Sequence, residues 1–185
     1  MQYRNKSVSA RELLENSRTL QKELGPRQIT FVVNDRPDVA LVADAAGVHL
    51  GQEDIDAEAA RKLLGPHKLV GVSTHNPEQF LAAAATSAGY ISIGPIFPTS
   101  SKANPDPVVG LDTLRAVRRQ TDKPVVAIGG ITLENAREVL DAGADSLAVI
   151  SDVLRAADPA KRARQFIDLL EKGDLRTSVQ DKTNG

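Results

Sequence analysis

Short apolar runs rich in β-branched residues recur along the chain, and most of them end in a polar, charged or glycine-containing cluster. Thr30–Val33 precedes Asn34 and Asp35, for example, and Tyr90–Ile93 precedes a segment that begins at Gly94. Apolar runs of this length with turn signals at their ends predict strands. Such segments lie near residues 2–4, 28–33, 46–49, 68–72, 89–93, 124–128 and 145–149.

Helix start and stop signals separate most of these runs. Ser9 and Glu12 have the spacing of a capping box, and Gly25 with Pro26 is expected to end that helix. The strand runs themselves are apolar without alternation, which is typical of strands covered on both faces. The pattern predicts an α/β fold of the TIM (β/α)8-barrel type. Further helix starts are expected at three polar residues, Asp56, Asn76 and Asp158.

The expected strands are one short of the eight that a complete barrel needs, and Met1 already stands beside the first of them. We therefore expect a barrel that lacks its first strand-helix unit, because the chain is truncated or its gene start is placed too late. Residues 1–173 are predicted to form one domain. The polar stretch 174–185 is expected to be a disordered tail.

Composition and charge exclude classes of function rather than identify one. The formal net charge of −1 gives no electrostatic basis for binding nucleic acid or an anionic membrane. The absence of cysteine excludes disulfides, thiol catalysis and cysteine-ligated metals. No apolar run reaches the roughly 18 to 20 residues that span a bilayer, and no signal peptide is recognisable. We expect a cytoplasmic protein.

Polar side chains gather at the ends of the predicted strands. Gln2, Arg4 and Lys6 would share one face of an extended strand, where two cations and an amide suit a phosphate or diphosphate. Asp35 and Asp54 follow neighbouring strands, and two carboxylates can hold Mg²⁺ while water and substrate phosphates complete its octahedron. Taken alone, the segment from Gln2 to Lys6 is more typical of a solvated terminus. Each of the two carboxylates, taken alone, is more typical of a helix cap or a turn. Their combination favours a metal-diphosphate site.

A long connection runs from Gly94 to a helix expected near Leu111, and long loops in compact domains are usually lids or binding loops. A surface excursion without function is the alternative. Gly129–Gly130 and Ile150–Ser151 follow the last two strands, which is the usual phosphate site of such barrels. The loop also carries a set of side chains suited to an anion, namely Thr99, Ser100, Ser101 and Lys102.

Six motifs occur in order with compatible spacings. They are Gln2-x-Arg4-x-Lys6, Asn34-Asp35, Gly47-Val48-His49-Leu50-Gly51-Gln52-x-Asp54, Gly71-Val72-Ser73, Gly94-Pro95-Ile96-Phe97-Pro98-Thr99-x-Ser101-Lys102 and Ala127-Ile128-Gly129-Gly130-Ile131. Together they closely resemble the thiamine-phosphate synthase family, from Gln2 to about Leu170. The resemblance implies a transferase that joins 4-amino-2-methyl-5-(diphosphooxymethyl)pyrimidine to 4-methyl-5-(2-phosphoethyl)thiazole, or its carboxylated form, and releases diphosphate.

The same resemblance implies roles for individual residues. Asp35 and Asp54 would hold Mg²⁺. The implied reaction is dissociative: diphosphate leaves first, and the thiazole nitrogen traps the pyrimidine-methyl cation, so no protein nucleophile is needed. The pyrimidine diphosphate would contact Gln2, Arg4, Lys6, Asn34, Ser73 and Lys102, of which Arg4, Lys6, Ser73 and Lys102 would be catalytic. The thiazole phosphate would contact Thr99, Ser100, Ser101, Gly130, Ile150 and Ser151.

One motif departs from the family pattern, because Ser101 stands where threonine is more common. The resemblance also implies a homodimer, which could cover open sheet edges. Two other functions stay open. A thiazole tautomerase on a similar barrel would need a proton-transfer residue such as His49 or His75, and an inactive barrel could serve as a binding module. The intact set of Asp35, Gln52, Asp54 and Lys102 favours the synthase.

Overall fold

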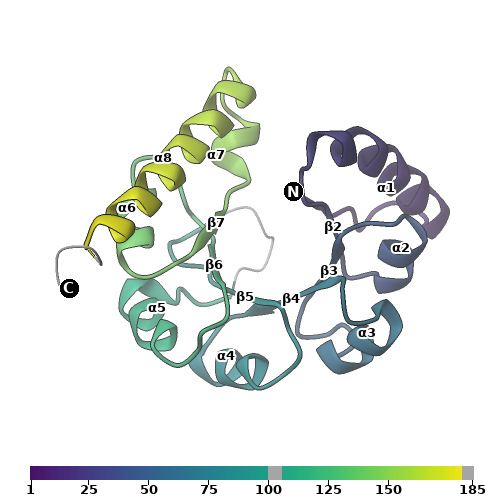
Figure 1. The fold of residues 1–185 in the computed structure, drawn as a ribbon, viewed down its shortest axis with the longest axis horizontal. Helices are drawn as coiled ribbons and strands as arrows, with labels where there is room; N and C mark the ends of the chain where they lie inside the picture. Colours follow the sequence, from purple (N-terminus) through teal and green to yellow (C-terminus); the bar gives the residue numbers. More distant parts are fainter. Residues whose placement is uncertain (100–105, 181–185) are drawn as a thin grey trace. The chain divides into compact units, whose positions relative to one another are not determined.

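The computed structural model describes residues 1–99 and 106–180, with side chains as far as residue 171. The chain divides into two compact units, Met1–Ser92 and Ile93–Gly185. In both units parallel strands alternate with helices (Figure 1). All seven predicted strands are present, so the α/β fold expected from the sequence is confirmed.

The first unit carries strands β1 to β5, which lie in chain order in a parallel sheet. The register pairs Asn34 with His49, and His49 with Gly71, so these positions lie side by side across three neighbouring strands. The elements are β1 (Gln2–Tyr3), α1 (Ala10–Leu24), the 3-10 helix η1 (Gly25–Arg27), β2 (Val32–Asn34), α2 (Pro37–Val42), β3 (Gly47–Leu50), α3 (Ala57–Leu64), β4 (Leu69–Thr74), α4 (Pro77–Ala84) and β5 (Tyr90–Ile93), which reaches the unit boundary.

Polar N-cap residues start the helices where the sequence predicts them. The amide of Glu12 donates to Oγ of Ser9 at 3.2 Å, and the amide of Ala59 donates to Oδ1 of Asp56 at 2.7 Å. Each bond satisfies an amide that has no partner within its own helix, which is worth about 1 kcal/mol. Asn76 caps α4 in the same way, and Pro77 takes the first helical position.

The core of the first unit lies between its sheet and helices α1, α2 and α3. All four residues of β3 are buried, which agrees with a strand covered on both faces. Full burial of each large apolar side chain contributes about 1.5–3 kcal/mol. The strands supply Val33, Val48, Leu50 and Val70, the residue before β2 supplies Phe31, and the helices supply Leu13, Val39, Ala40, Ala57, Ala60 and Leu64.

The second unit carries the remaining strands, which pair in parallel with Val126 opposite Ser146. The segment after β5 attaches to the end of β6, because the amides of Ile96 and Phe97 donate to the carbonyl groups of Ile128 (2.9 Å) and Gly129 (3.1 Å). The elements are α5 (Gly110–Arg118), β6 (Val125–Ile128), α6 (Ala136–Asp141), β7 (Ser146–Ala148), α7 (Ser151–Leu154) and α8 (Pro159–Gln180).

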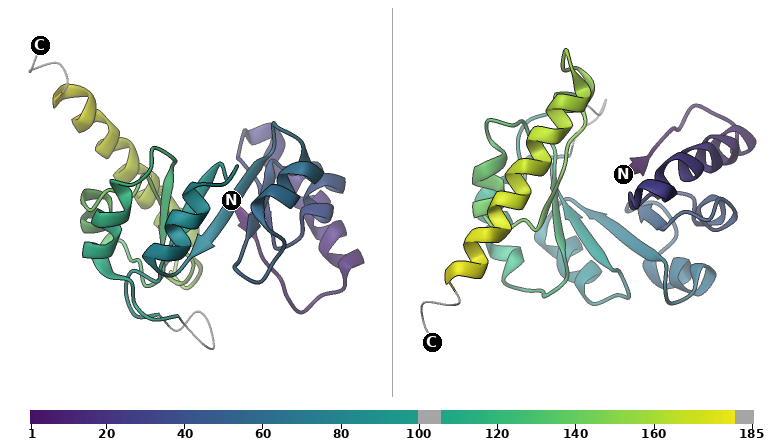
Figure 2. Two further views of the ribbon diagram at one scale, coloured as in Figure 1. Left: turned by 90° about the horizontal axis from the view of Figure 1, so that it is seen from below. Right: turned by 45° about the horizontal axis from the view of Figure 1, so that its top comes forward.

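Helix α8 is one long, unbroken helix (Figure 2). It begins where Asp158 caps it, with the amide of Lys161 donating to Oδ1 at 2.9 Å. It continues to Gln180, so the backbone is helical across part of the stretch that the sequence suggested as a disordered tail from residue 174. None of the helices in the described residues is both long and apolar enough to cross a membrane.

Candidate active site

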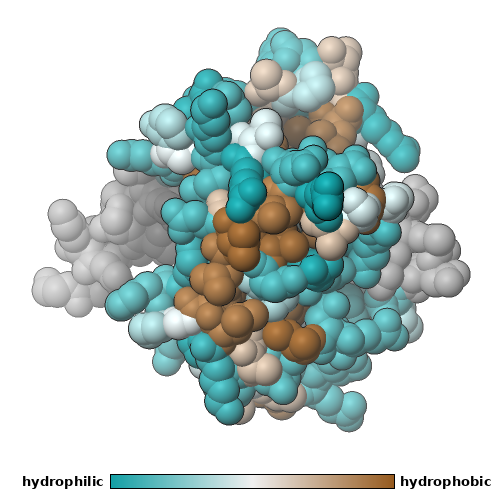
Figure 3. Space-filling view, turned by 90° about the vertical axis from the view of Figure 1, so that its right-hand side faces the viewer, coloured by the Kyte–Doolittle hydropathy of each residue, from teal (hydrophilic) through white to brown (hydrophobic). Residues whose placement is uncertain are grey.

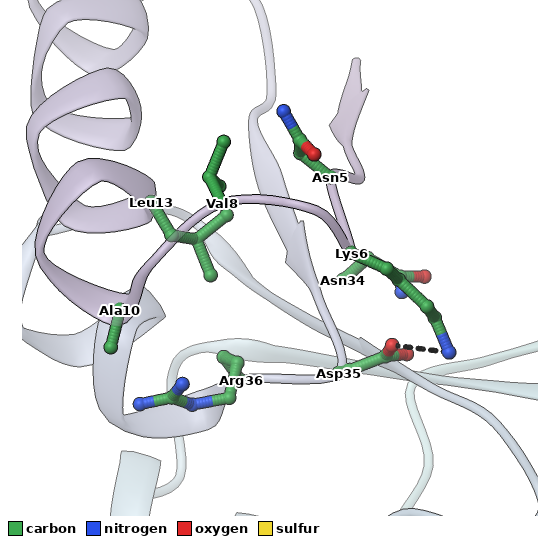
Figure 4. A pocket seen from close by; sticks show the side chains of 8 residues that line it. All are labelled: Asn5, Lys6, Val8, Ala10, Leu13, Asn34, Asp35 and Arg36. Carbon is green, nitrogen blue, oxygen red and sulfur yellow. Dashed lines mark ion pairs between the residues drawn. The ribbon is translucent and has the colours of Figure 1, made fainter.

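An ion pair joins the segment after β1 to the end of β2. Nζ of Lys6 lies 3.0 Å from Oδ2 of Asp35, and the two side chains point toward each other among the residues that line a pocket of about 260 Å³ (Figure 4). The Lys6 side chain is 62% exposed, and exposed pairs contribute only about 0–1 kcal/mol to stability. The pair therefore matters more as a charged surface of the pocket than as support for the fold.

Backbone geometry fixes the place of Asp35. Its φ of 65° lies in the left-handed region, where aspartate and asparagine are enriched several-fold among residues other than glycine. Its amide donates to the carbonyl of His49 at 2.8 Å. This turn at the end of β2 directs the Asp35 carboxylate toward the neighbouring strand end.

A second carboxyl group, that of Asp54, lies within hydrogen-bonding reach of Asp35. Oδ2 of Asp54 accepts a hydrogen bond from the amide of Gly51 at 2.7 Å. Burial raises the pKa of Asp54 above its ordinary value and the adjacent Asp35 raises it further, whereas the Gly51 amide and Lys6 act in the opposite direction. Two carboxylates that repel each other in this way are suited to a cation placed between them.

The carboxylate pair fits Mg²⁺ better than a metal that needs a complete set of protein ligands. Within residues 1–99 and 106–180, no cluster of three or more His, Asp or Glu side chains is arranged to hold a metal ion. Mg²⁺ is usually bound by one or two carboxylates, with water and substrate phosphates as its other ligands. Asp35 and Asp54 supply that number of protein oxygens.

The polar residues of β1 and β2 meet next to the ion pair. Nε2 of Gln2 donates to Oδ1 of Asn34 at 3.1 Å, as their shared place at the strand ends predicts. Arg4 is exposed, and among the described residues no hydrogen bond or ion pair joins it to this group. The structure thus brings together Gln2, Asn34 and Lys6, while the predicted role of Arg4 stays a prediction.

Ser73, at the end of β4, belongs to a hydrogen-bonded chain that the sequence did not reveal. Its Oγ lies 2.7 Å from Nε2 of His49, and Nδ1 of His49 lies 2.8 Å from the hydroxyl of Tyr90. Burial lowers the pKa of His49 to about 4, although Asp35 acts in the opposite direction, and burial raises the pKa of Tyr90. Nε2 of Gln52 donates to the carbonyl of Ser73 at 2.6 Å.

The structure makes His49 unsuitable for the proton-transfer role that a tautomerase would require. It is 8% exposed, and each ring nitrogen already contacts a hydroxyl group. A general acid or base must reach the proton it transfers. This geometry is that of a histidine whose ring is held inside the protein rather than one that reaches a substrate.

In the second unit, Gly129 and Gly130 allow the backbone of the segment before Thr99 to approach them closely. Their φ values are 93° and 65°, and a Cβ on Gly130 would lie 2.6 Å from the carbonyl oxygen of Pro98. Asn135 holds the turn, because its Nδ2 donates to the carbonyl of Gly130 at 3.0 Å. The glycine pair therefore lets the segment before Thr99 dock on the end of β6.

The other predicted ligands of the thiazole phosphate are only partly described. Ile150 is 50% exposed and immediately precedes α7, which begins at Ser151. Thr99 is the last described residue before the gap at 100–105, so Ser100, Ser101 and Lys102 lie outside the described residues. Their predicted contacts stay predictions.

Parallel strands that alternate with helices, and charged side chains at the ends of those strands, are the arrangement of an α/β-barrel type of enzyme. The sequence model of the family described as thiamine monophosphate synthase matches residues 1–153, and the chain belongs to that family, whose curated members are transferases. The resemblance recognised from the six motifs is thereby confirmed.

Individual relatives support the same assignment. A thiamine-phosphate synthase of Koribacter versatilis is 56% identical over 92% of this chain and 79% of its own length. One from Shouchella clausii is 44% identical over 93% of this chain and 82% of its own length. The solved structure of thiamine phosphate pyrophosphorylase from Pyrococcus furiosus is 40% identical, has a TM-score of 0.85, and matches 93% of this chain and 82% of that one.

Proposed function

We propose that this chain joins 4-amino-2-methyl-5-(diphosphooxymethyl)pyrimidine to 4-methyl-5-(2-phosphoethyl)thiazole, or its carboxylated form, and releases diphosphate. The observation that carries the proposal is the contact between Asp35 and Asp54 beside Lys6, in a chain that belongs to the thiamine monophosphate synthase family. A divalent cation held by the two carboxylates, together with Lys6, would neutralise the negative charge of a leaving diphosphate.

In this proposal Asp35 and Asp54 bind Mg²⁺, which when bound neutralises charge on the diphosphate. Lys6 adds a positive charge at the same place, and Ser73 supplies a hydroxyl group. Stabilising charge that develops on a leaving group is often the largest single contribution to catalysis. The reaction is dissociative, because the aminopyrimidine can stabilise its own methyl cation once diphosphate has left.

Other residues position the two substrates. Gln2 and Asn34, already hydrogen-bonded to each other, face the pyrimidine, and Arg4 joins Lys6 at the diphosphate. Lys102 lies outside the described residues, and its contact with the diphosphate is proposed from the family resemblance alone. The thiazole phosphate is held by residues of the second half of the chain, namely Thr99, Ser100, Ser101, Gly130, Ile150 and Ser151.

Turnover of the two substrates tests this function. Purified protein with both substrates and Mg²⁺ is expected to release diphosphate and form thiamine phosphate, and a chelator is expected to stop the reaction. Asp54→Asn is expected to lower kcat/KM at least 100-fold, because it removes one of two metal ligands. Asp112→Asn is the matched control, since the Asp112 side chain is fully exposed and pairs with Arg115. Full activity of Asp54→Asn would refute the metal assignment.

We further propose a homodimer located in the cytoplasm. Apolar side chains gather on the face of the first unit that carries α1, α2 and α3 (Figure 3), and exposed apolar residues of this unit include Ile29, Leu41, Val42 and Leu63. Exposed apolar patches commonly mark protein interfaces. Light scattering coupled to gel filtration is expected to give twice the mass of one chain, and cell fractionation tests the location.

A further inference from the structure

The hydroxyl groups of Ser73 and Tyr90 lie at opposite ends of a buried imidazole. His49 contacts Ser73 through Nε2 at 2.7 Å and Tyr90 through Nδ1 at 2.8 Å. The His49 and Tyr90 rings also stack, with centroids 5.5 Å apart and an angle of 24° between their planes. The three residues come from neighbouring strands, β3, β4 and β5. In the function proposed above, these three hydrogen-bonded side chains have no role beyond that of the Ser73 hydroxyl group.

Hydrogen-bond chemistry restricts how the protons are arranged. A neutral imidazole has one N–H donor and one acceptor nitrogen, and burial of His49 at 8% exposure favours the neutral ring. One hydroxyl must therefore donate to the ring, and the other must accept from it. The phenol of Tyr90 is more acidic than the aliphatic hydroxyl of Ser73, so it is the better donor.

We propose that Tyr90 and His49 are positioning residues for Ser73. The Tyr90 hydroxyl donates to Nδ1 of His49, and the Nε2–H group of His49 donates to Oγ of Ser73. The hydroxyl hydrogen of Ser73 is then left available to donate to an anionic oxygen of the ligand. The identity of that oxygen as part of the substrate diphosphate rests on the proposed function, whereas the direction of the hydrogen bonds does not.

The opposite arrangement would have a different consequence. If Ser73 donated to Nε2, its only hydrogen would be used within the protein, and Oγ could then only accept hydrogen bonds. An anionic oxygen is itself an acceptor, so in that arrangement Ser73 would have no hydrogen left to donate to it. Hydrogen bonds from a neutral donor to a charged oxygen are also stronger than those between neutral groups.

The surrounding backbone holds these residues in place. A Cβ on Gly71 would lie 2.0 Å from Cζ of Tyr90, so the Tyr90 ring occupies the space that the missing side chain leaves. On the other side, Gln52 donates to the carbonyl of Ser73 at 2.6 Å. The ring of Tyr90 and the backbone of Ser73 are therefore fixed independently of the hydrogen bonds through His49.

Nitrogen NMR of the ligand-free protein tests the direction directly. Uniformly ¹⁵N-labelled protein is expected to show His49 with its proton on Nε2 and an unprotonated, hydrogen-bonded Nδ1, and His49→Gln assigns the signals by their loss. In Tyr90→Phe, Nδ1 loses its donor, so the Nδ1 signal is expected to shift and the proton to be shared between both ring nitrogens. A proton on Nδ1 in the unaltered protein would overturn the proposal, whatever its activity.

A double-mutant cycle on turnover separates positioning from packing. Tyr90→Phe keeps the ring against Gly71 and is expected to lower kcat/KM for the pyrimidine diphosphate about tenfold, while Ser73→Ala lowers it at least as much. In the Ser73→Ala background, Tyr90→Phe is expected to have no further effect, because it acts through Ser73. Multiplicative effects would show that Tyr90 acts by another route and would refute the proposal.

Tyr3→Phe provides the matched control. The hydroxyl group of Tyr3 accepts a hydrogen bond from Nδ2 of Asn16 at 3.0 Å, in a part-buried place of the same unit. Tyr3→Phe therefore loses a comparable hydrogen bond but leaves the hydrogen bonds of His49 unchanged. It is expected to keep the kcat/KM of the unaltered protein. If the chain formed no thiamine phosphate at all, the proposed function would fail, and the proton position on His49 would still decide the hydrogen-bond direction by itself.

Discussion

Acidification is expected to destabilise the protein through His49. Burial lowers the pKa of this residue to about 4, against an ordinary value of 6.5. The unfolded chain therefore binds a proton between these pH values while the folded chain does not. The stability that depends on neutral His49 is present above pH 6.5 and is lost as the pH falls toward 4.

The size of the effect follows from the two pKa values. Their difference corresponds to a limit of about 3.4 kcal/mol, reached only below pH 4. Between pH 7.5 and pH 5.0 the expected loss is about 2 kcal/mol, which is a large part of the margin of 5–15 kcal/mol typical of a folded domain.

Urea unfolding at a series of pH values measures this loss. The His49→Gln variant cannot titrate at this position, so subtracting its pH profile removes the contribution of the carboxylates and of the other histidines. The difference is expected to change by about 2 kcal/mol between pH 7.5 and 5.0. A direct NMR titration of the His49 ring gives the folded pKa independently. A flat difference, or a ring that titrates near 6.5, would refute the reasoning.

Two further outcomes follow from the same unit. Asp35→Asn is expected to lower the pKa of Asp54, because the Asp35 carboxyl raises it; a ¹³C titration of the Asp54 carboxyl group checks the sign, and an unchanged pKa would mean that the two groups do not interact. Gly71→Ala is expected to destabilise the protein by about 1–3 kcal/mol, because the new methyl group overlaps the Tyr90 ring. Denaturant unfolding measures this cost, and Gly71→Ala should cost clearly less in a Tyr90→Ala background if the overlap is its cause.

The local elements could be predicted because their signals are local. Ser9, Asp56 and Asn76 cap helices by contacting amides three residues away, and such spacings are readable in any sequence. The strands follow from short apolar runs. The proximity of Asp35 and Asp54 was also predictable, because both follow neighbouring parallel strands, whose carboxyl ends lie at the same edge of the sheet.

The hydrogen bonds among His49, Ser73 and Tyr90 could not be predicted, because the pairing register of three separate strands brings these residues together. Tyr90 begins a strand that looks like any other apolar run, and nothing near it in sequence marks its hydroxyl as a partner of His49. The only indirect signal is Gly71, whose lack of a side chain makes room for the ring. The sequence predicts the start of α8 at Asp158, but the polar stretch from residue 174 to Gln180 does not indicate that the helix continues that far.

The left-handed backbone of Asp35 restricts what evolution or a designer can place at this position. Asparagine and glycine tolerate a φ of 65° but carry no charge. Glutamate keeps the charge, but it is not among the residues that are enriched in the left-handed region. A library of all amino acids at position 35, selected for growth without an external source of the thiamine product, should therefore return almost only aspartate. Aspartate meets both requirements, a left-handed backbone and a negative charge.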